Sequence, residues 1–242
     1  MTIVELTEVK AFLERYRAFR EEHASLFVED FKQRFRGLAS GLKLALTAEK
    51  EVVRLTSPEF SLFNTLRIEG DEDKHSRFIH HLLDPTGEHG QGALFLAAFL
   101  DMLSDLPESA DQRVVVPGIG TVGDWWVQRE RTIPNGRPDL VLSNRRQHWI
   151  LVIENKISTQ DHGDQLTRYA KWLESLGQQY EHRYLAYLTP TGAPAITPPP
   201  GAYLRLSYCE DISEWLETAL PAVMAPRIRG AIQEYLHLIG TF

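Results

Sequence analysis

Two short apolar segments of this chain carry charged side chains where a buried strand should have none. The first begins with Asp139, directly after a proline, and the second contains Glu154 and Lys156 after five consecutive apolar residues. Because successive side chains of a strand point to opposite faces, Glu154 and Lys156 share one face. If the two segments pair, Asp139 reaches the same place. The sequence therefore predicts a sheet that carries a charged cluster at its edge.

Such a cluster has two physical interpretations. Two carboxylates and an ammonium group suit a hydrolytic Mg²⁺ site, in which oxygen ligands hold the ion and the lysine meets developing negative charge. The alternative is a satisfied network of ion pairs at the end of a sheet. In either case the charges cannot stand alone, because a buried charge needs a partner or a metal.

The composition limits the classes of protein that the chain can belong to. Its 242 residues suffice for one sizeable core. A net charge of −7 argues against a protein that coats nucleic acid through many phosphate contacts, although it leaves room for a local basic groove. The single cysteine, Cys209, excludes an intramolecular disulfide and a cysteine-based zinc cluster.

We expect a cytoplasmic protein with no membrane partner. No apolar run approaches the roughly 18 residues that a membrane span requires. The first 20 residues mix acids and bases and lack the apolar middle and the cleavage site of a secretory signal.

The order of elements predicts an α/β fold with an added helical region. Residues 1–60 are expected to form an N-terminal helical region packed on the core, and residues 61–242 a single domain. Helices are expected at residues 4–51, 72–83, 93–103, 164–176, 212–219 and 221–239, and strands at 124–131, 139–143, 149–157, 183–188 and 203–208. The helix between the third and fourth strands implies that they pair in parallel. We therefore expect a central mixed sheet of about five strands flanked by helices.

The ordered pair Pro138-Asp139 and the triplet Glu154-Asn155-Lys156 resemble the PD-(D/E)xK nuclease superfamily, which has the restriction-endonuclease-like fold. The triplet alone is weak evidence, because such sequences are common on exposed strands and helices. Its place at the end of an apolar strand makes the resemblance stronger. The resemblance covers roughly residues 63–190.

Two flanking helices extend this resemblance. The segment that begins Glu72-x-x-His75-Ser76 is similar to the first helices of a bacterial branch of the superfamily. On a helix Glu72 lies in line with apolar positions, which turns its carboxylate toward the sheet. Gln165 and Tyr169, one helical turn apart, are similar to the Gln-x-x-x-Tyr element that follows the catalytic strand in several nuclease branches.

The resemblance implies a role for each matching residue. Asp139 and Glu154 would bind Mg²⁺, or Mn²⁺ in its place, together with the backbone carbonyl of Asn155, whose side chain has no implied role. Lys156 would position or deprotonate the attacking water or stabilise the transition state. The catalytic set implied is Glu72, Asp139, Glu154, Lys156, Gln165 and Tyr169.

The sequence thus predicts a Mg²⁺-dependent nuclease, with DNA as the favoured substrate and a role in defence or repair implied by the family. A non-catalytic module that binds nucleic acid or protein is the alternative, as is a nuclease that acts on RNA. A homodimer or a partner that supplies specificity is compatible with the sequence. His75 and Ser76 are expected to buttress their helix through hydrogen bonds.

Overall fold

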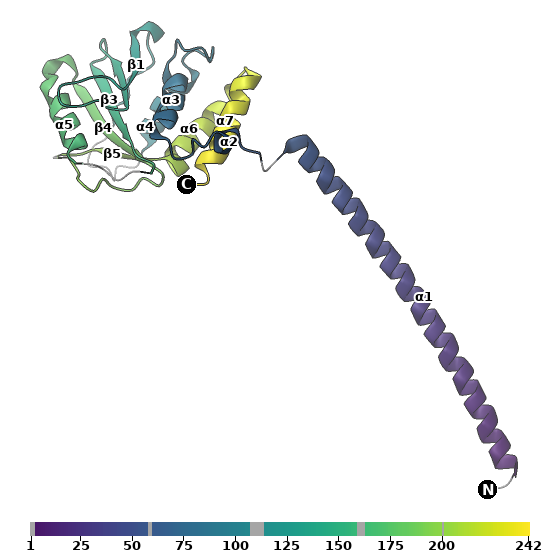
Figure 1. Ribbon diagram of the computed structural model, residues 1–242. Coiled ribbons are helices and arrows are strands. Elements are labelled where there is room, and N and C mark those ends of the chain that lie inside the picture. Colours follow the sequence, from purple (N-terminus) through teal and green to yellow (C-terminus); the bar gives the residue numbers. More distant parts are fainter. Residues whose placement is uncertain (1–2, 58–59, 107–113, 159–162, 200) are drawn as a thin grey trace. The chain divides into compact units, whose positions relative to one another are not determined.

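The computed structural model describes residues 3–57, 60–106, 114–158, 163–199 and 201–242. The chain divides into two units, Met1–Phe60 and Ser61–Phe242, and each is described by itself. Figure 1 shows the helices and strands of both units.

The first unit is built on one long helix, α1 (Ile3–Thr56). It continues through Gly37 and Gly41 and ends just before Ser57, which has a positive φ. Large apolar side chains are exposed along its length, including Phe27, which is 72% exposed. Although α1 is long, it is too polar to cross a membrane, and no other helix in the described ranges qualifies.

The second unit contains the expected mixed sheet of five strands in the order β1-β2-β3-β4-β5. The first three strands are antiparallel neighbours, and β3, β4 and β5 run parallel to one another. The parallel pairing of β3 with β4 confirms what the helix between them implied. The strands are β1 (Trp125–Arg129), β2 (Leu140–Asn144), β3 (Trp149–Asn155), β4 (His182–Thr189) and β5 (Leu204–Ser207).

Helices cover the two faces of the sheet unequally (Figure 1). One face lies in a large core with the helices α3 (Glu72–Leu83), α4 (Leu94–Asp105), α6 (Ser213–Ala219) and α7 (Pro226–Ile239). The short α2 (Leu62–Thr65) contacts α7. The opposite face packs against α5 (Gln165–Ser175) alone among the described helices. The unit is therefore an α/β sandwich with one thick and one thin helical layer.

The last helix begins later in the structure than the sequence pattern predicts. A helix from residue 221 was predicted, but Pro221 lies in a short 3₁₀ turn, η4 (Leu220–Ala222), and α7 starts at Pro226. Proline suits the first position of a helix and disfavours helical geometry in the residue before it. Ala225 is accordingly extended, with a ψ of 115°, and separates the two segments.

We expect Asp71→Ala to destabilise the second unit. Asp71 caps α3, since its side chain accepts a hydrogen bond from the Lys74 N–H, and loss of such a cap costs about 1 kcal/mol. Urea unfolding followed by tryptophan fluorescence measures the change. Asp101→Ala, at an exposed position inside α4, is the control and should have a smaller effect. Equal effects of the two substitutions would contradict the assignment of the cap.

Candidate active site

The charged cluster lies where the beginning of β2 meets the end of β3. Leu140 and Ile153 are opposite each other in the antiparallel pair, which brings the preceding Asp139 beside the end of β3. The Asn155 N–H donates to Oδ2 of Asp139 over 2.7 Å. The predicted pairing of the two charged segments is therefore present.

The start of α3 brings Glu72 to the same point. Its Oε1 accepts a hydrogen bond of 3.0 Å from the Ile157 N–H, and its Oε2 lies 3.4 Å from Nζ of Lys156. Nζ of Lys156 also lies 3.0 Å from Oε1 of Glu154. Three carboxylates from three elements thus gather around one ammonium group.

The Asn155 side chain links β3 to the helical layer by hydrogen bonds, although the sequence implied no role for this side chain. Its Nδ2 donates to the backbone carbonyl of Glu72 at 3.1 Å and to Oγ of Ser76 at 3.0 Å. Its Oδ1 accepts from the Tyr208 hydroxyl at 3.0 Å. This amide therefore fixes the distance between the end of β3 and the start of α3.

Burial disfavours the ionised form of the carboxylates. It raises the pKa of Glu154 to about 8, and the charge of Asp139 contributes to the rise. It likewise raises the pKa of Asp139. Burial alone would lower the pKa of Lys156, but the neighbouring carboxylates, Glu154 foremost, outweigh it and leave that pKa above its usual value. The cluster thus holds more negative charge than its lysine neutralises when every carboxylate is ionised.

The residues present fit a hard divalent cation. Oε2 of Glu154 is buried and, among the described residues, has no donor from which to accept a hydrogen bond. Asp139 beside it offers only acceptor atoms when ionised. No group of three His, Cys, Asp or Glu side chains with the arrangement of a metal site occurs in the described ranges. Two carboxylates and the carbonyl of Asn155 would therefore need water or substrate oxygens to complete a Mg²⁺ shell, as is common for this ion.

The structure places Gln165 and Tyr169 of α5 next to this cluster. Tyr169 is buried, and burial together with the charges of Glu154 and Asp139 raises its pKa to about 12. Its hydroxyl interacts with the Arg137 backbone and with the Gln165 side chain. All six residues of the predicted catalytic set are thus brought together.

A glycine before Asp139 permits this close packing. A Cβ atom at Gly136 would lie only 2.6 Å from Cε1 of Tyr169, well inside contact distance. The tyrosine ring therefore rests directly on the backbone that leads into Asp139. This approach explains why the loop before β2 has glycine at that position.

The histidines near α3 take structural positions. His75 is buried, with Nδ1 at 2.8 Å from the Tyr235 hydroxyl and Nε2 at 3.1 Å from the Glu69 carbonyl. Together with the bond between Ser76 and Asn155, this matches the expected buttressing role of His75 and Ser76. His80 and His89 interact with backbone carbonyls.

Comparison with known protein families gave one match that spans most of the chain. A family model described as the PD-(D/E)XK nuclease superfamily matches residues 60–236. Neither the curated proteins nor the solved structures yielded a match.

In the absence of metal, we expect the stability of the protein to fall as the pH rises from about 5 to about 8. The folded state keeps a proton on Glu154 up to about pH 8, whereas the unfolded chain releases it near the ordinary value of 4.5. The folded state therefore binds more protons in this window, and its free energy of unfolding decreases as they are lost. Glu154→Gln should remove this contribution and be more stable than the native chain above pH 8, by roughly 1 to 3 kcal/mol.

Urea unfolding in a chelating buffer across this pH range measures the effect. Glu181→Gln, at an exposed position before β4, is the matched control and should follow the native curve. Parallel curves for the native chain and Glu154→Gln would contradict the buried ionisation.

We expect Asn155→Ala to destabilise the second unit by about 2 to 4 kcal/mol, because it leaves buried donors and acceptors of Ser76, Tyr208 and Glu72 without their partner. Chemical denaturation measures the change. Asn64→Ala, at an exposed position of α2, should change the free energy of unfolding by less than about 0.5 kcal/mol. A loss at Asn155 no larger than at Asn64 would refute the role of this amide.

Proposed function

Because the chain belongs to the PD-(D/E)XK nuclease superfamily and has the restriction-endonuclease-like α/β fold, we propose that it is a Mg²⁺-dependent nuclease that hydrolyses phosphodiester bonds in DNA. Residues 61–242 form the nuclease domain in this proposal, and residues 1–60 an N-terminal helical region. The family resemblance supports a role in defence against foreign DNA or in repair, and we place that role in the cytoplasm.

One observation carries the proposal more than any other. Glu154 has a buried carboxylate oxygen with no hydrogen-bond donor among the described residues, beside the second carboxylate of Asp139. A purely structural network would satisfy both oxygens, because an unpaired buried acceptor costs free energy. A bound cation would satisfy this oxygen and remove the repulsion between the two carboxylates.

Asp139, Glu154 and the carbonyl of Asn155 would hold the metal in this proposal. A Mg²⁺ ion held there would lower the pKa of its bound water and offset charge on the scissile phosphate. The nearby Lys156 carries a positive charge at neutral pH in the metal-free protein, because the carboxylates raise its pKa. In this proposal the ammonium group stabilises the negative charge that develops on the phosphate in the transition state. Because the lysine is already in place, this is preorganised electrostatic stabilisation.

The remaining residues would hold the reacting groups in place. Glu72 accepts from the Ile157 N–H and lies 3.4 Å from Nζ of Lys156, which restrains the lysine side chain. Tyr169 and Gln165 close the other side of the cluster, where the neutral phenol hydroxyl can donate to a phosphate oxygen. These are positioning roles, since the two carboxylates and the lysine carry the chemistry.

We expect Asp139→Ala and Lys156→Ala each to lower the rate of DNA cleavage in Mg²⁺ by at least roughly a hundredfold, the usual scale for loss of a charged group that stabilises the transition state. Supercoiled, linear and single-stranded DNA, and RNA, are incubated with each protein and separated on gels. A chelator should abolish cleavage, and Mn²⁺ should restore it.

Asp101→Asn, on the exposed side of α4, is the control and should cleave at the native rate. Cleavage that survives both substitutions would refute the assignment of the site. Cleavage of RNA alone would overturn the choice of DNA as substrate, and no cleavage of any substrate by the native chain would favour a binding module.

A further inference from the structure

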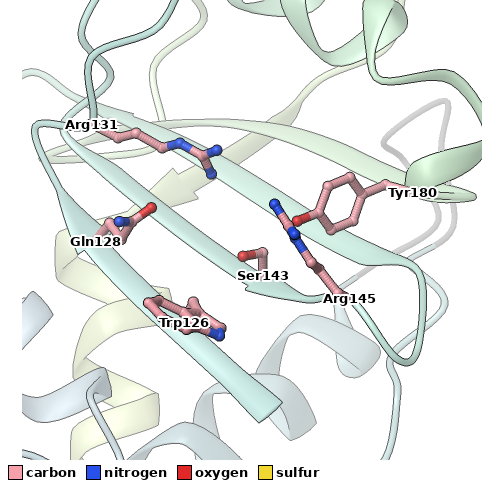
Figure 2. A pocket seen from close by; sticks show the side chains of 6 residues that line it. All are labelled: Trp126, Gln128, Arg131, Ser143, Arg145 and Tyr180. Carbon is pink, nitrogen blue, oxygen red and sulfur yellow. The ribbon is translucent and has the colours of Figure 1, made fainter.

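A pocket lies on the thinly covered face of the sheet, away from the charged cluster (Figure 2). It has a volume of about 270 Å³. Its lining comes from β1, from β2 and from the loops after β1, after β2 and before β4. The lining residues are Trp126, Gln128, Arg131, Ser143, Arg145 and Tyr180. No acidic side chain is among them.

The strand register places this pocket and the charged cluster on one face of the sheet. Ser143 is four residues beyond Asp139, and its partner Ile150 is four residues before Glu154. Side chains four residues apart on a strand share a face, at a separation of roughly 13 Å. The loop after β1 contributes Arg131 to the pocket and Gly136 to the packing around Tyr169, so it borders both sites.

The lining side chains combine a flat apolar surface with positive charge. Trp126 is 61% exposed although it lies within a strand. Neither Arg131 nor Arg145 forms an ion pair with a carboxylate in the described part of the chain, and Figure 2 shows both guanidinium groups pointing into the pocket. The neighbouring Arg146 differs, because it pairs with Asp124 at 3.0 Å. Arg131 lies over the ring of Trp172, 5.3 Å from its centroid, but this contact leaves its charge without a carboxylate among the described residues. In a chain with a net charge of −7, two such guanidinium groups beside an exposed indole indicate an anionic ligand with a planar group.

We propose that this pocket binds one unpaired nucleotide of the nucleic acid that the charged cluster cleaves, with the base stacked on Trp126 and the phosphate held by Arg131 and Arg145. The inference rests on the proposed nuclease function and extends it. Gln128, Ser143 and Tyr180 supply an amide and two hydroxyl groups, which can form hydrogen bonds with a base edge.

The pocket favours a strand with unpaired bases over a continuous duplex. A base can stack on an indole ring only after it leaves its neighbours, which costs least in single-stranded segments. The volume of the pocket limits it to about one nucleotide. The substrate would therefore carry an unpaired segment within a few nucleotides of the phosphodiester that is cut.

Binding in a chelating buffer tests the pocket without cleavage. Fluorescence anisotropy compares a labelled single-stranded oligodeoxynucleotide, a blunt duplex and the same duplex with a single-stranded overhang. The native chain should bind the single strand and the duplex with the overhang more tightly than the blunt duplex. Trp126→Ala and Arg145→Ala should each weaken binding of the single strand by about tenfold, the scale of one lost stacking or phosphate contact.

Arg146→Ala is the matched control, since it removes the same charge from the next residue. Trp126→Phe should recover part of the affinity, and thermal unfolding of each variant confirms that it is folded. Three results would each refute nucleotide binding in the pocket. They are an equal loss of affinity in Arg145→Ala and Arg146→Ala, native affinity in Trp126→Ala, and tighter binding of the blunt duplex than of the single strand.

These results are separable from the nuclease proposal. If the native chain cleaves DNA and the pocket variants bind as tightly as the native chain, nucleotide binding in the pocket is refuted and the nuclease proposal stands. Binding that depends on the pocket without cleavage would refute the nuclease and leave a nucleotide-binding site. Absence of binding by the native chain would also refute the pocket.

A second surface, on α1, carries an independent inference. Large apolar residues recur at intervals of eleven: Phe31, Leu42 and Val53 form one series, and Tyr16, Phe27 and Leu38 another. Val9 lies two intervals before Phe31, with Arg20 at the position between them. An eleven-residue repeat keeps an apolar stripe facing a partner helix in a right-handed supercoil. All seven side chains are at least 48% exposed. A stripe of this length needs a partner, because isolated helices gain little stability from propensity alone.

The charges of α1 identify a second copy of the same helix, in antiparallel orientation, as that partner. Residues 3–29 contain six acidic and four basic side chains, and residues 30–56 contain three acidic and six basic ones. The two halves therefore carry net charges of −2 and +3. Antiparallel pairing places each half against the half of opposite sign, whereas parallel pairing places like against like. We infer that α1 forms an antiparallel helical dimer.

Sedimentation equilibrium of the full chain should show a dimer. Phe27→Glu with Leu38→Glu should yield a monomer. Ser25→Glu with Ser40→Glu, which adds the same charge on the opposite face of α1, should remain dimeric.

The orientation of the two helices is measured with a spin label at Glu8→Cys in a Cys209→Ser background. An antiparallel dimer keeps two such labels tens of ångströms apart, since α1 rises about 1.5 Å per residue. A monomeric native chain, or labels within about 20 Å of each other, would overturn the inference.

Discussion

The candidate site depends on the position of Asn155 between the sheet and the thick helical layer of the second unit. Its backbone N–H fixes Asp139, and its side chain joins β3 to α3 and to Tyr208. The residue is fully buried, so these bonds form in a low-dielectric environment and are costly to leave unmade. One residue therefore sets where three carboxylates meet, although its own side chain does not face the cluster.

That geometry works against stability in the absence of a cation. Glu154 and Asp139 are buried beside each other, and the pKa of each is raised because ionisation in this place is unfavourable. Lys156 offsets one charge and Glu72 adds another. A well-packed apolar cluster in the same place would make the folded state more stable. Groups that cost stability in this way are typical of sites for binding or catalysis.

The sequence predicted the parts of the fold that follow from periodicity. Alternation along β3 placed Glu154 beside Lys156, and the helix between β3 and β4 predicted their parallel pairing. It could not predict the role of the Asn155 side chain, because its partners Ser76 and Tyr208 are 79 and 53 residues away along the chain. Nor could it predict where the last helix begins, since either Pro221 or Pro226 could start a helix.

The sequence could not predict the pocket either, because the segments that line it come together only when the sheet has formed. Trp126 and Ser143 are opposite each other in the register of β1 and β2, and Tyr180 arrives from the segment before β4. Each of these residues alone has an ordinary structural explanation. Only their convergence on the face that α5 leaves open supports the binding role that we propose for them.

The unequal layers of the sandwich explain why binding and stability can occupy opposite faces. The thick layer of α3, α4, α6 and α7 buries most of the apolar core, so it can hold the sheet rigid without help from the other side. The thin layer consists of α5, which covers Val152 and the cluster end of the sheet and leaves Trp126 exposed. A strand of nucleic acid that reaches the carboxylates from this side would cross the open part of the same face. In the proposed complex, the thin layer would therefore provide both the access to the site and the surface on which a substrate is held.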